Sequence, residues 1–188
     1  MLAVRQENEP LPIQAAKDGE SAAWQSLFRR FRLPLFVYVA ELVQSREEAL
    51  DIVQETFANA SRYIGKLRDD SKFASWLFQI SHQKCIRYLE RRGQKASMEL
   101  PLDEESQYLS SAESNPREWA IRKEDEEAFS RMLEQLPIAQ RSVLLLHFVE
   151  DFSLEEIAEI SGVPVGTVKS RMHHARKTLR KLLGKENL

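Results

Sequence analysis

The sequence of 188 residues predicts an all-α protein with two small helical domains joined by a flexible acidic linker. Apolar residues recur at helical spacing through most of the chain, whereas long strand-like alternation is absent and only 6 residues are glycine. This periodicity is lost over residues 96–118, which separates a first domain at 11–95 from a second at 119–184. A hydrophobic content of 43% is sufficient for a core in each domain.

The first domain begins with an amphipathic helix pattern followed by a proline. The apolar positions of this helix are Ala15, Ala22, Ala23, Leu27, Phe28 and Phe31. Pro34 predicts a break or a new helix start, and residues 35–43 after it are strongly apolar. Ser45 is a candidate N-cap of the next helix, because Glu48 stands at the capping-box position three residues later.

A polar loop at 65–72 leads into the last helix of the first domain, which begins at Phe73. We expect Trp76 to belong to the core rather than to a stacking platform, because it shares a helical register with Phe73 and Ile80. The helix ends in the basic run at 91–95. Three or four packed helices of this length are enough for a domain.

The segment at 96–118 is predicted to be a flexible linker, with an ordered surface loop as the alternative. It carries six acidic side chains and one basic one, Arg117. Low hydrophobicity and high charge cannot offset the entropy lost on ordering. We therefore expect the two domains to have no fixed spacing in the free chain.

The second domain opens with helix patterns and ends in two helices joined by a tight turn. Ser153 and Glu156 fit a capping box, Gly162 suits the left-handed position that ends a helix, and Pro164 fits the start of the next. This pattern favours a helix-turn-helix, whose second helix enters the DNA major groove. A plain helical hairpin is the alternative. The upstream helix patterns lie at 119–136 and 140–149, on either side of Pro137.

The last of these helices is basic on one side and apolar on the other. Its apolar stripe consists of Val168, Met172, Ala175, Leu179 and Leu182. Residues 166–183 hold six Lys or Arg side chains and no acid, in a chain of net charge −2, which indicates a phosphate-facing surface. The near-neutral total does not exclude nucleic acid, because residues 96–140 alone carry 4 basic and 11 acidic side chains.

Other function classes find little support. No apolar run approaches the roughly 20 residues of a membrane span, and residues 1–12 do not resemble a secretory signal. The single cysteine, Cys85, excludes an internal disulfide, fits a reducing cytoplasm and is expected to be buried and inert. We expect no enzyme, metal or cofactor, because phosphate-loop, nucleophile-elbow and metal-ligand motifs are absent from the sequence.

Motifs in both domains resemble one family. In the second domain they are Leu136-Pro137, Gln140-Arg141, Phe152-Ser-Leu-Glu-Glu-Ile-Ala-Glu159 and Val165-Gly-Thr-Val-Lys-Ser-Arg171. In the first domain they are Asp51-Ile-Val-Gln-Glu-Thr-Phe57 and Phe73-Ala-Ser-Trp-Leu-Phe-Gln-Ile80. Together these motifs are similar to bacterial RNA polymerase sigma factors of the extracytoplasmic-function group.

The resemblance implies a sigma factor that binds RNA polymerase core through its clamp and flap, recognises promoter DNA and opens it. It also implies an anti-sigma factor as partner. In the first domain, the family's core-binding positions fall on Asp51, Gln54 and Glu55. Those for the minus-10 element, including the loop that captures a flipped base, fall on Arg68, Asp69, Asp70, Ser71, Lys72, Gln83, Lys84, Arg87 and Arg91. The family often has Asn where this chain has Gln83.

In the second domain, the resemblance implies contact with the minus-35 element through the last helix. The corresponding positions are Thr167, Lys169, Ser170, Arg171, His173, His174, Arg176 and Lys177. Lys169 can donate to guanine acceptors, whereas His174 stands where many relatives have Arg. Two alternatives remain: an ordinary dimeric helix-turn-helix regulator that binds a palindromic operator, and a sigma-like protein that only sequesters another protein.

Overall fold

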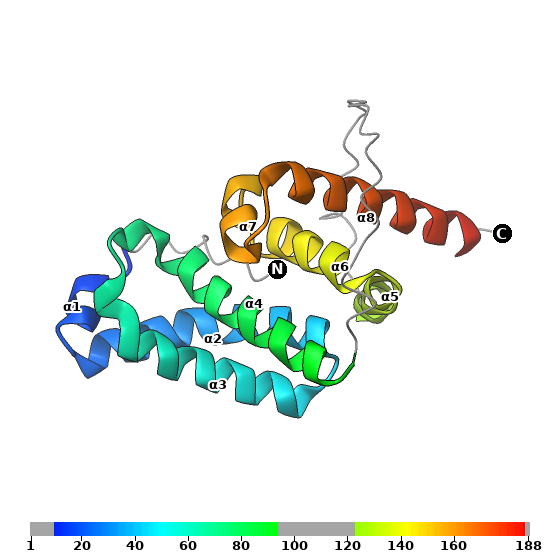
Figure 1. The fold of residues 1–188 in the computed structure, drawn as a ribbon. Helices are drawn as coiled ribbons and strands as arrows, with labels where there is room; N and C mark the ends of the chain where they lie inside the picture. The colour runs from blue at the N-terminus through cyan, green and yellow to red at the C-terminus, as the bar shows by residue number, and fades with distance from the viewer. Residues whose placement is uncertain (1–9, 94–122, 187–188) are drawn as a thin grey trace.

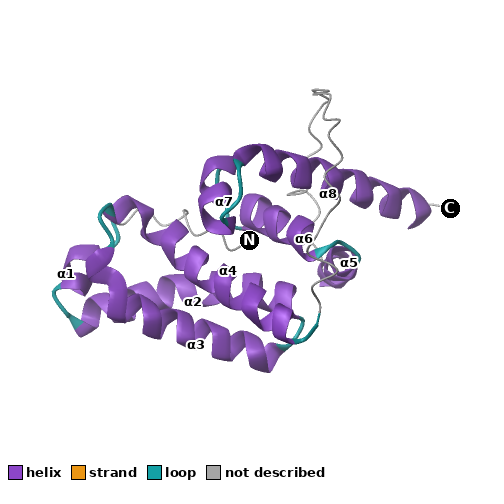
Figure 2. Ribbon diagram, viewed as in Figure 1, coloured by secondary structure: helices purple, strands orange, loops and turns teal. Residues whose placement is uncertain are grey.

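The computed structural model describes residues 10–93 and 123–186, and these residues form helices joined by short turns (Figures 1 and 2). The first half contains α1 (Ile13–Lys17), α2 (Ser21–Val43), α3 (Arg46–Tyr63), the 3-10 turns η1 (Ile64–Lys66) and η2 (Asp70–Lys72), and α4 (Phe73–Arg91). The second contains α5 (Lys123–Glu134), α6 (Ile138–Leu144), the π-helical turn η5 (Leu145–Val149), α7 (Leu154–Ser161) and α8 (Val165–Glu186). The all-α prediction is confirmed. The predicted linker at 96–118 lies outside the described residues, as does Trp119.

The helix ends follow the local sequence signals. The Ser45 side chain accepts a hydrogen bond from the Glu48 backbone N–H at 3.5 Å, which caps α3. Ser153 and Glu156 form the predicted capping box at the start of α7. Gly162 ends α7 at φ +66°, in the left-handed region that glycine tolerates best.

Two expectations for the first helix pattern are wrong. The pattern is divided into α1 and α2, with Gly19 between them at φ +86°. Pro34 breaks nothing, because α2 continues through it for 23 residues. Phe31 and Leu35, on either side of Pro34, are fully buried. Their packing offsets the backbone hydrogen bond that proline cannot donate.

Helices α2, α3 and α4 pack against one another and enclose the core of the first half. Phe31 of α2 meets Phe73 of α4 with ring centroids 5.4 Å apart. Trp76 is half-buried beside Phe73, with ring centroids 6.0 Å apart, so it packs against the core as expected without being fully buried in it. This three-helix arrangement leaves the outer face of α3 to solvent, whereas α4 also packs against α7 of the second half.

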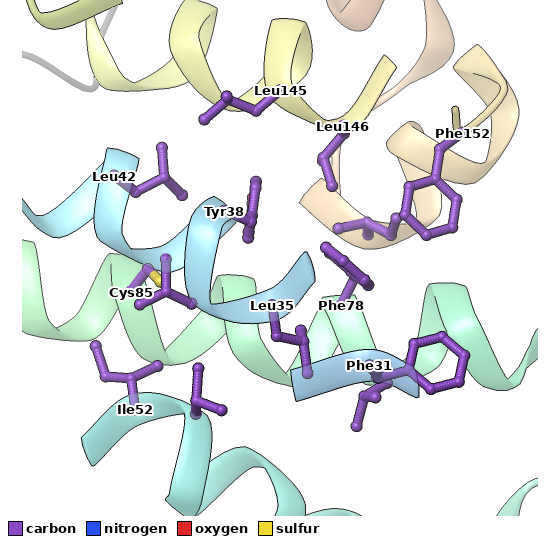
Figure 3. Packing of buried hydrophobic residues seen from close by; sticks show 14 of the residues in the cluster. Phe31, Leu35, Tyr38, Leu42, Ile52, Phe78, Cys85, Leu145, Leu146 and Phe152 are labelled. Carbon is purple, nitrogen blue, oxygen red and sulfur yellow. The ribbon is translucent and has the colours of Figure 1, made fainter. Parts of the chain in front are cut away.

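The two halves pack directly against each other, contrary to the expectation that they have no fixed spacing. Leu145, Leu146 and Phe152 of the second half point toward α2 and α4 (Figure 3). Phe152 meets Phe78 of α4 with ring centroids 5.1 Å apart. Tyr38 of α2 lies opposite the two leucines (Figure 3). The described part of the chain therefore has one continuous apolar core that crosses from one half to the other.

Candidate nucleic-acid interface

The basic helix α8 separates its apolar and polar side chains as its spacing predicts. Val168, Met172 and Ala175 are buried against the rest of the second half. The exposed side chains of the predicted minus-35 set are Lys169, His173, Arg176 and Lys177. The remaining members are half-buried and flank that exposed row: Thr167, Ser170, Arg171 and His174. A row of exposed donors on one helix face is suited to contacts in a DNA groove.

One arginine of this set has a contact inside the protein, and another is partly withdrawn from solvent. Arg176 lies over the ring of Phe148, with its guanidinium carbon 5.4 Å from the ring centroid. Burial lowers the pKa of the Arg171 guanidinium. Arg171 is also near enough to the first half to act on His82, whose pKa is lowered to about 4 by burial first and by the Arg171 charge second. Arg171 therefore lies toward the boundary between the halves.

The predicted base-capturing loop is held by short-range hydrogen bonds. Asp69 accepts hydrogen bonds from the Ser71 N–H at 3.0 Å and from the Ser71 hydroxyl at 2.6 Å, and these bonds lower the pKa of the Asp69 carboxyl. Asp70 forms an ion pair with Lys17 of α1. Arg68, Asp69 and Ser71 are exposed. The loop thus presents a cation, a carboxylate and a hydroxyl to solvent in a fixed turn.

A basic ridge continues from this loop along α4. Gln83, Arg87 and Arg91 are exposed and follow each other at intervals of four, so they lie on one side of the helix. Lys84 is half-buried and forms a 2.6 Å ion pair with Glu55 of α3. This ion pair connects the predicted minus-10 surface to the predicted polymerase surface, a link that the sequence motifs did not show.

The predicted polymerase-binding side chains are exposed on α3. Asp51, Gln54 and Glu55 point outward, while Ile52 and Val53 are buried beneath them. The same side of α3 continues into a shallow groove that sequence reasoning missed. The groove is lined by Trp24, Gln25, Phe28, Arg29, Arg32, Phe57, Ala58 and Ser61. Phe28, predicted as part of the apolar stripe, keeps 42% of its surface exposed there.

A buried polar cluster lies where the two halves meet, and no sequence motif pointed to it. The Tyr38 hydroxyl is 2.8 Å from His82 Nδ1 and 2.9 Å from the Ser142 hydroxyl. Glu150 is completely buried nearby, and its carboxylate oxygens have no hydrogen-bond partner among the described residues. Burial raises the pKa of Glu150 to about 8. Burial likewise raises the pKa of Cys85 to about 12, in line with the predicted inert thiol.

The described residues contain no cluster of three or more His, Cys, Asp or Glu side chains that could hold a metal ion. Among the same residues, no helix has the length and apolar character needed to span a membrane.

Comparison with known proteins assigns the family. The model described as Sigma-70 region 2 matches residues 27–95, and the model described as Sigma-70, region 4 matches residues 126–179. The chain is 30% identical over 172 residues to the ECF RNA polymerase sigma-E factor of Escherichia coli K12. The alignment covers 89% of this chain and 90% of that protein. The chain belongs to the ECF group of the sigma-70 family.

Other relatives of this sigma factor agree. The RNA polymerase sigma-H factor of Pseudomonas aeruginosa is 28% identical over 183 residues, with 95% of each chain covered. A co-crystal structure of the sigma factor RpoE with the anti-sigma factor NepR, from Bartonella quintana, is similar with a TM-score of 0.62 and 25% identity, over 85% of this chain and 98% of that one. The structure of CnrH in complex with the cytosolic domain of CnrY shares the fold, with a TM-score of 0.66 and 23% identity. The match covers 92% of this chain and 95% of that one.

Proposed function

We propose that this sigma factor binds RNA polymerase core, directs it to promoters and helps to open the DNA strands. The observation that carries the proposal is the presence of both sigma regions in order, each with an exposed polar surface of fitting charge. We assign the domain at 11–95 to polymerase and minus-10 binding, the segment at 96–118 to the linker, and the domain at 119–184 to minus-35 binding. The chain acts by recognition and catalyses no reaction itself.

The acidic side chains on α3 support a contact with the polymerase clamp. Asp51, Gln54 and Glu55 form an exposed row above a buried apolar layer. The adjacent groove adds exposed aromatic surface at Phe28, which can anchor a partner helix. We propose that the polymerase surface extends from the acidic row into this groove.

The promoter surfaces are proposed on the same basis. We propose that Lys169 and His173, both exposed on α8, contact base edges of the minus-35 element, and that the surrounding cations contact phosphates. We propose that the exposed Arg68, Asp69 and Ser71 hold a flipped base, and that Gln83 and Arg87 contact the single strand. Since RpoE was solved with an anti-sigma factor, we also propose an anti-sigma factor as partner. We propose a cytoplasmic site of action, because the proposed function requires RNA polymerase.

Reconstitution with RNA polymerase core tests this function. We expect promoter-dependent transcripts and permanganate-reactive thymines near the start site only when core and this chain are both present. The matched control is the double variant Asp51→Lys, Gln54→Lys. It changes the exposed α3 row from acidic to basic and leaves the buried side chains of the protein unchanged. Tight, symmetric protection of a palindromic duplex by the free chain would instead support a dimeric regulator.

A further inference from the structure

One lysine that precedes the matched sigma region holds the predicted base-capturing loop. Lys17 is the last residue of α1, and the match to region 2 begins only at residue 27. The Lys17 ammonium donates to the Leu67 backbone carbonyl at 2.9 Å and to the Asp70 carboxylate. Between these two acceptors lie Arg68 and Asp69. A single side chain therefore binds both ends of this stretch of the loop.

Helix α1 is itself fixed to the domain, so it can serve as an anchor. Ile13 and Ala16 are buried, and the Trp24 indole N–H of α2 donates to the Ala16 carbonyl at 3.1 Å. Gly19, at φ +86°, turns the chain so that α1 packs against both α2 and η1 (Figure 1). The Lys17 side chain is only 19% exposed between α1 and the loop. Its ammonium is thus presented to the loop from a rigid base.

The bonds inside the loop are local and shape its turn. Asp69 accepts from the Ser71 N–H and hydroxyl, and the Lys72 N–H donates to the Asp69 carbonyl at 3.0 Å. These bonds join residues at most three positions apart, so they do not connect the turn to another helix. The bond from Lys17 to Leu67 spans 50 positions of the sequence and makes that connection within the first half.

The ion pair with Lys17 also sets the role of Asp70. Asp70 is half-buried, whereas Arg68, Asp69 and Ser71 are exposed. An unpaired carboxylate beside a DNA strand repels the phosphates, and Lys17 supplies the opposite charge in direct contact. Asp70 therefore anchors the loop, and the three exposed side chains beside it are left to meet a base.

We propose that Lys17 is a positioning residue for base capture, because it holds the loop at Leu67 and Asp70 in the geometry that receives a flipped base. This inference rests on the proposed minus-10 function. Flipping a base out of its stack costs free energy that contacts in the pocket must offset. A loop that is already ordered loses less conformational entropy on binding, so more of the contact energy is left to hold the base.

Binding of the minus-10 strand by the holoenzyme tests this role. Core polymerase carrying this chain is titrated with the single strand of a promoter that the wild-type holoenzyme transcribes, and with a series in which each base in turn is replaced by an abasic site. The captured base is the one whose removal weakens wild-type binding most. Lys17→Met keeps an unbranched stem without the ammonium and should weaken binding of the intact strand by roughly tenfold. On the strand without the captured base, the same change should cost no more than about twofold, because the loop then has no base to hold.

Two further variants separate anchoring from a general effect of charge. Lys66→Met removes an exposed ammonium that lies 4.8 Å from the centroid of the Tyr63 ring, directly before Leu67 in the sequence. It should weaken binding of the intact and abasic strands equally, by about twofold, as expected for a lost nonspecific attraction. Asp70→Ala should lose part of the binding that Lys17→Met loses. Adding it to Lys17→Met should cost nothing further, since both changes remove the same anchor.

Hydrogen exchange in the free chain gives a readout without polymerase. The Ser71 and Lys72 amides should exchange faster in Lys17→Met than in Lys66→Met, because only the first variant releases the loop from α1. Equal exchange in the two variants would show that Lys17 does not hold the loop.

The binding data distinguish failure of this role from failure of the proposed function. A loss of the same factor on every strand, a loss of affinity for core, or wild-type binding by Lys17→Met would each overturn the positioning role of Lys17 alone. If the wild-type holoenzyme instead binds every abasic strand as tightly as the intact one, no base is captured. The proposed minus-10 function of the loop then fails, and the positioning role fails with it.

Discussion

The least expected residue in the structure is Glu150, a carboxyl group with no exposed surface and no hydrogen-bond partner among the described residues. It lies near Tyr38, whose pKa is raised chiefly by burial and further by the charges of Cys85 and Glu150. Burying a carboxylate without compensation is costly, so the group holds a proton to a higher pH instead. Ionisation of Glu150 therefore lowers the stability of the folded state.

This cost predicts that stability falls as the pH rises. The pKa of Glu150 is raised from 4.5 to about 8 in the folded chain. The stability associated with the protonated Glu150 is fully present below the pKa of the unfolded chain. It is lost as the pH rises through the pKa of the folded chain, by on the order of 3–5 kcal/mol. Glu150→Gln should remove most of this loss between pH 5 and pH 8.5. The measurement is the free energy of unfolding in urea at each pH.

Two comparisons make the Glu150 prediction specific. Glu155→Gln, at an exposed position of α7, should keep the wild-type pH dependence. His82 acts on the acid side, because burial and the Arg171 charge lower its pKa from 6.5 to about 4, so stability is lost as the pH falls through that range. The acid loss should remain in Glu150→Gln. An unchanged slope above pH 6 in that variant would show that Glu150 ionises without cost.

Sequence reasoning succeeded at residues whose partners are near in the chain. Ser153 and Glu156 are three positions apart, and their capping box follows from spacing alone. Tyr38 and Ser142 bond across 104 positions, and nothing in either local sequence marks the other. Glu150 could not be foreseen either, because an acid beside a turn is normally solvated, whereas this one is buried near Tyr38 of α2.

At the scale of an element, the helix-turn-helix contains two glycines with different backbone conformations. Gly162 ends α7 at φ +66°, whereas Gly166 lies in the first turn of α8. A Cβ added at either position meets no atom within 4 Å. The effect of alanine at each is therefore set by backbone conformation alone.

Alanine substitutions at these glycines should change stability in opposite directions. Gly162→Ala forces a side chain into the left-handed region and should destabilise the protein by about 1 kcal/mol. Gly166→Ala removes backbone freedom from the unfolded chain and should stabilise it by about 0.4–1 kcal/mol. Chemical unfolding followed by circular dichroism measures both. Equal effects of the same sign would contradict the assigned conformations.

The basic face of α8 carries the second element-scale prediction. Lys169→Ala removes an exposed cation next to the buried Val168 and should weaken minus-35-dependent transcription by roughly 5- to 150-fold, since a lost base contact costs about 1–3 kcal/mol. Lys181→Ala removes the same charge three turns later and should have a smaller, sequence-independent effect. Transcription from promoters with intact and scrambled minus-35 elements distinguishes base recognition from phosphate contact.

Element boundaries show where periodicity stops being informative. The helix predicted at 140–149 begins earlier, as α6 at Ile138, and continues into the π-helical turn η5. The Glu150 and Phe152 N–H groups bond back to the carbonyls of Leu145 and Leu146 at 3.2 and 3.0 Å. These wider bonds and the positive φ of Asp151 redirect the chain into α7. Apolar spacing alone does not distinguish such a turn from a regular helix.

For the whole molecule, the sequence predicted the two helical units but not their contact. The apolar positions Leu145, Leu146 and Phe152 could each have belonged to the core of the second half alone. Their use against α2 and α4 depends on shape and on polar partners such as Gln79, whose amide donates to the Glu159 carbonyl of α7 at 3.1 Å. Such partners look like ordinary surface residues in the sequence. A docked interface is a property of two surfaces, and periodicity describes only one at a time.

The docked halves predict a link between interface strength and polymerase affinity. If core requires an open chain, in which the halves are separated, its apparent dissociation constant equals the intrinsic one divided by the open fraction. Gln79→Glu should raise that fraction and tighten binding by the same factor that lowers the closed-to-open ratio, up to roughly tenfold for about 1.4 kcal/mol. Gln83→Glu, with the same charge, should bind core as the wild type does. Titration of labelled chain with core, without DNA, measures both constants. Equal affinities of Gln79→Glu and wild type would mean that core binds the closed chain as well as the open one.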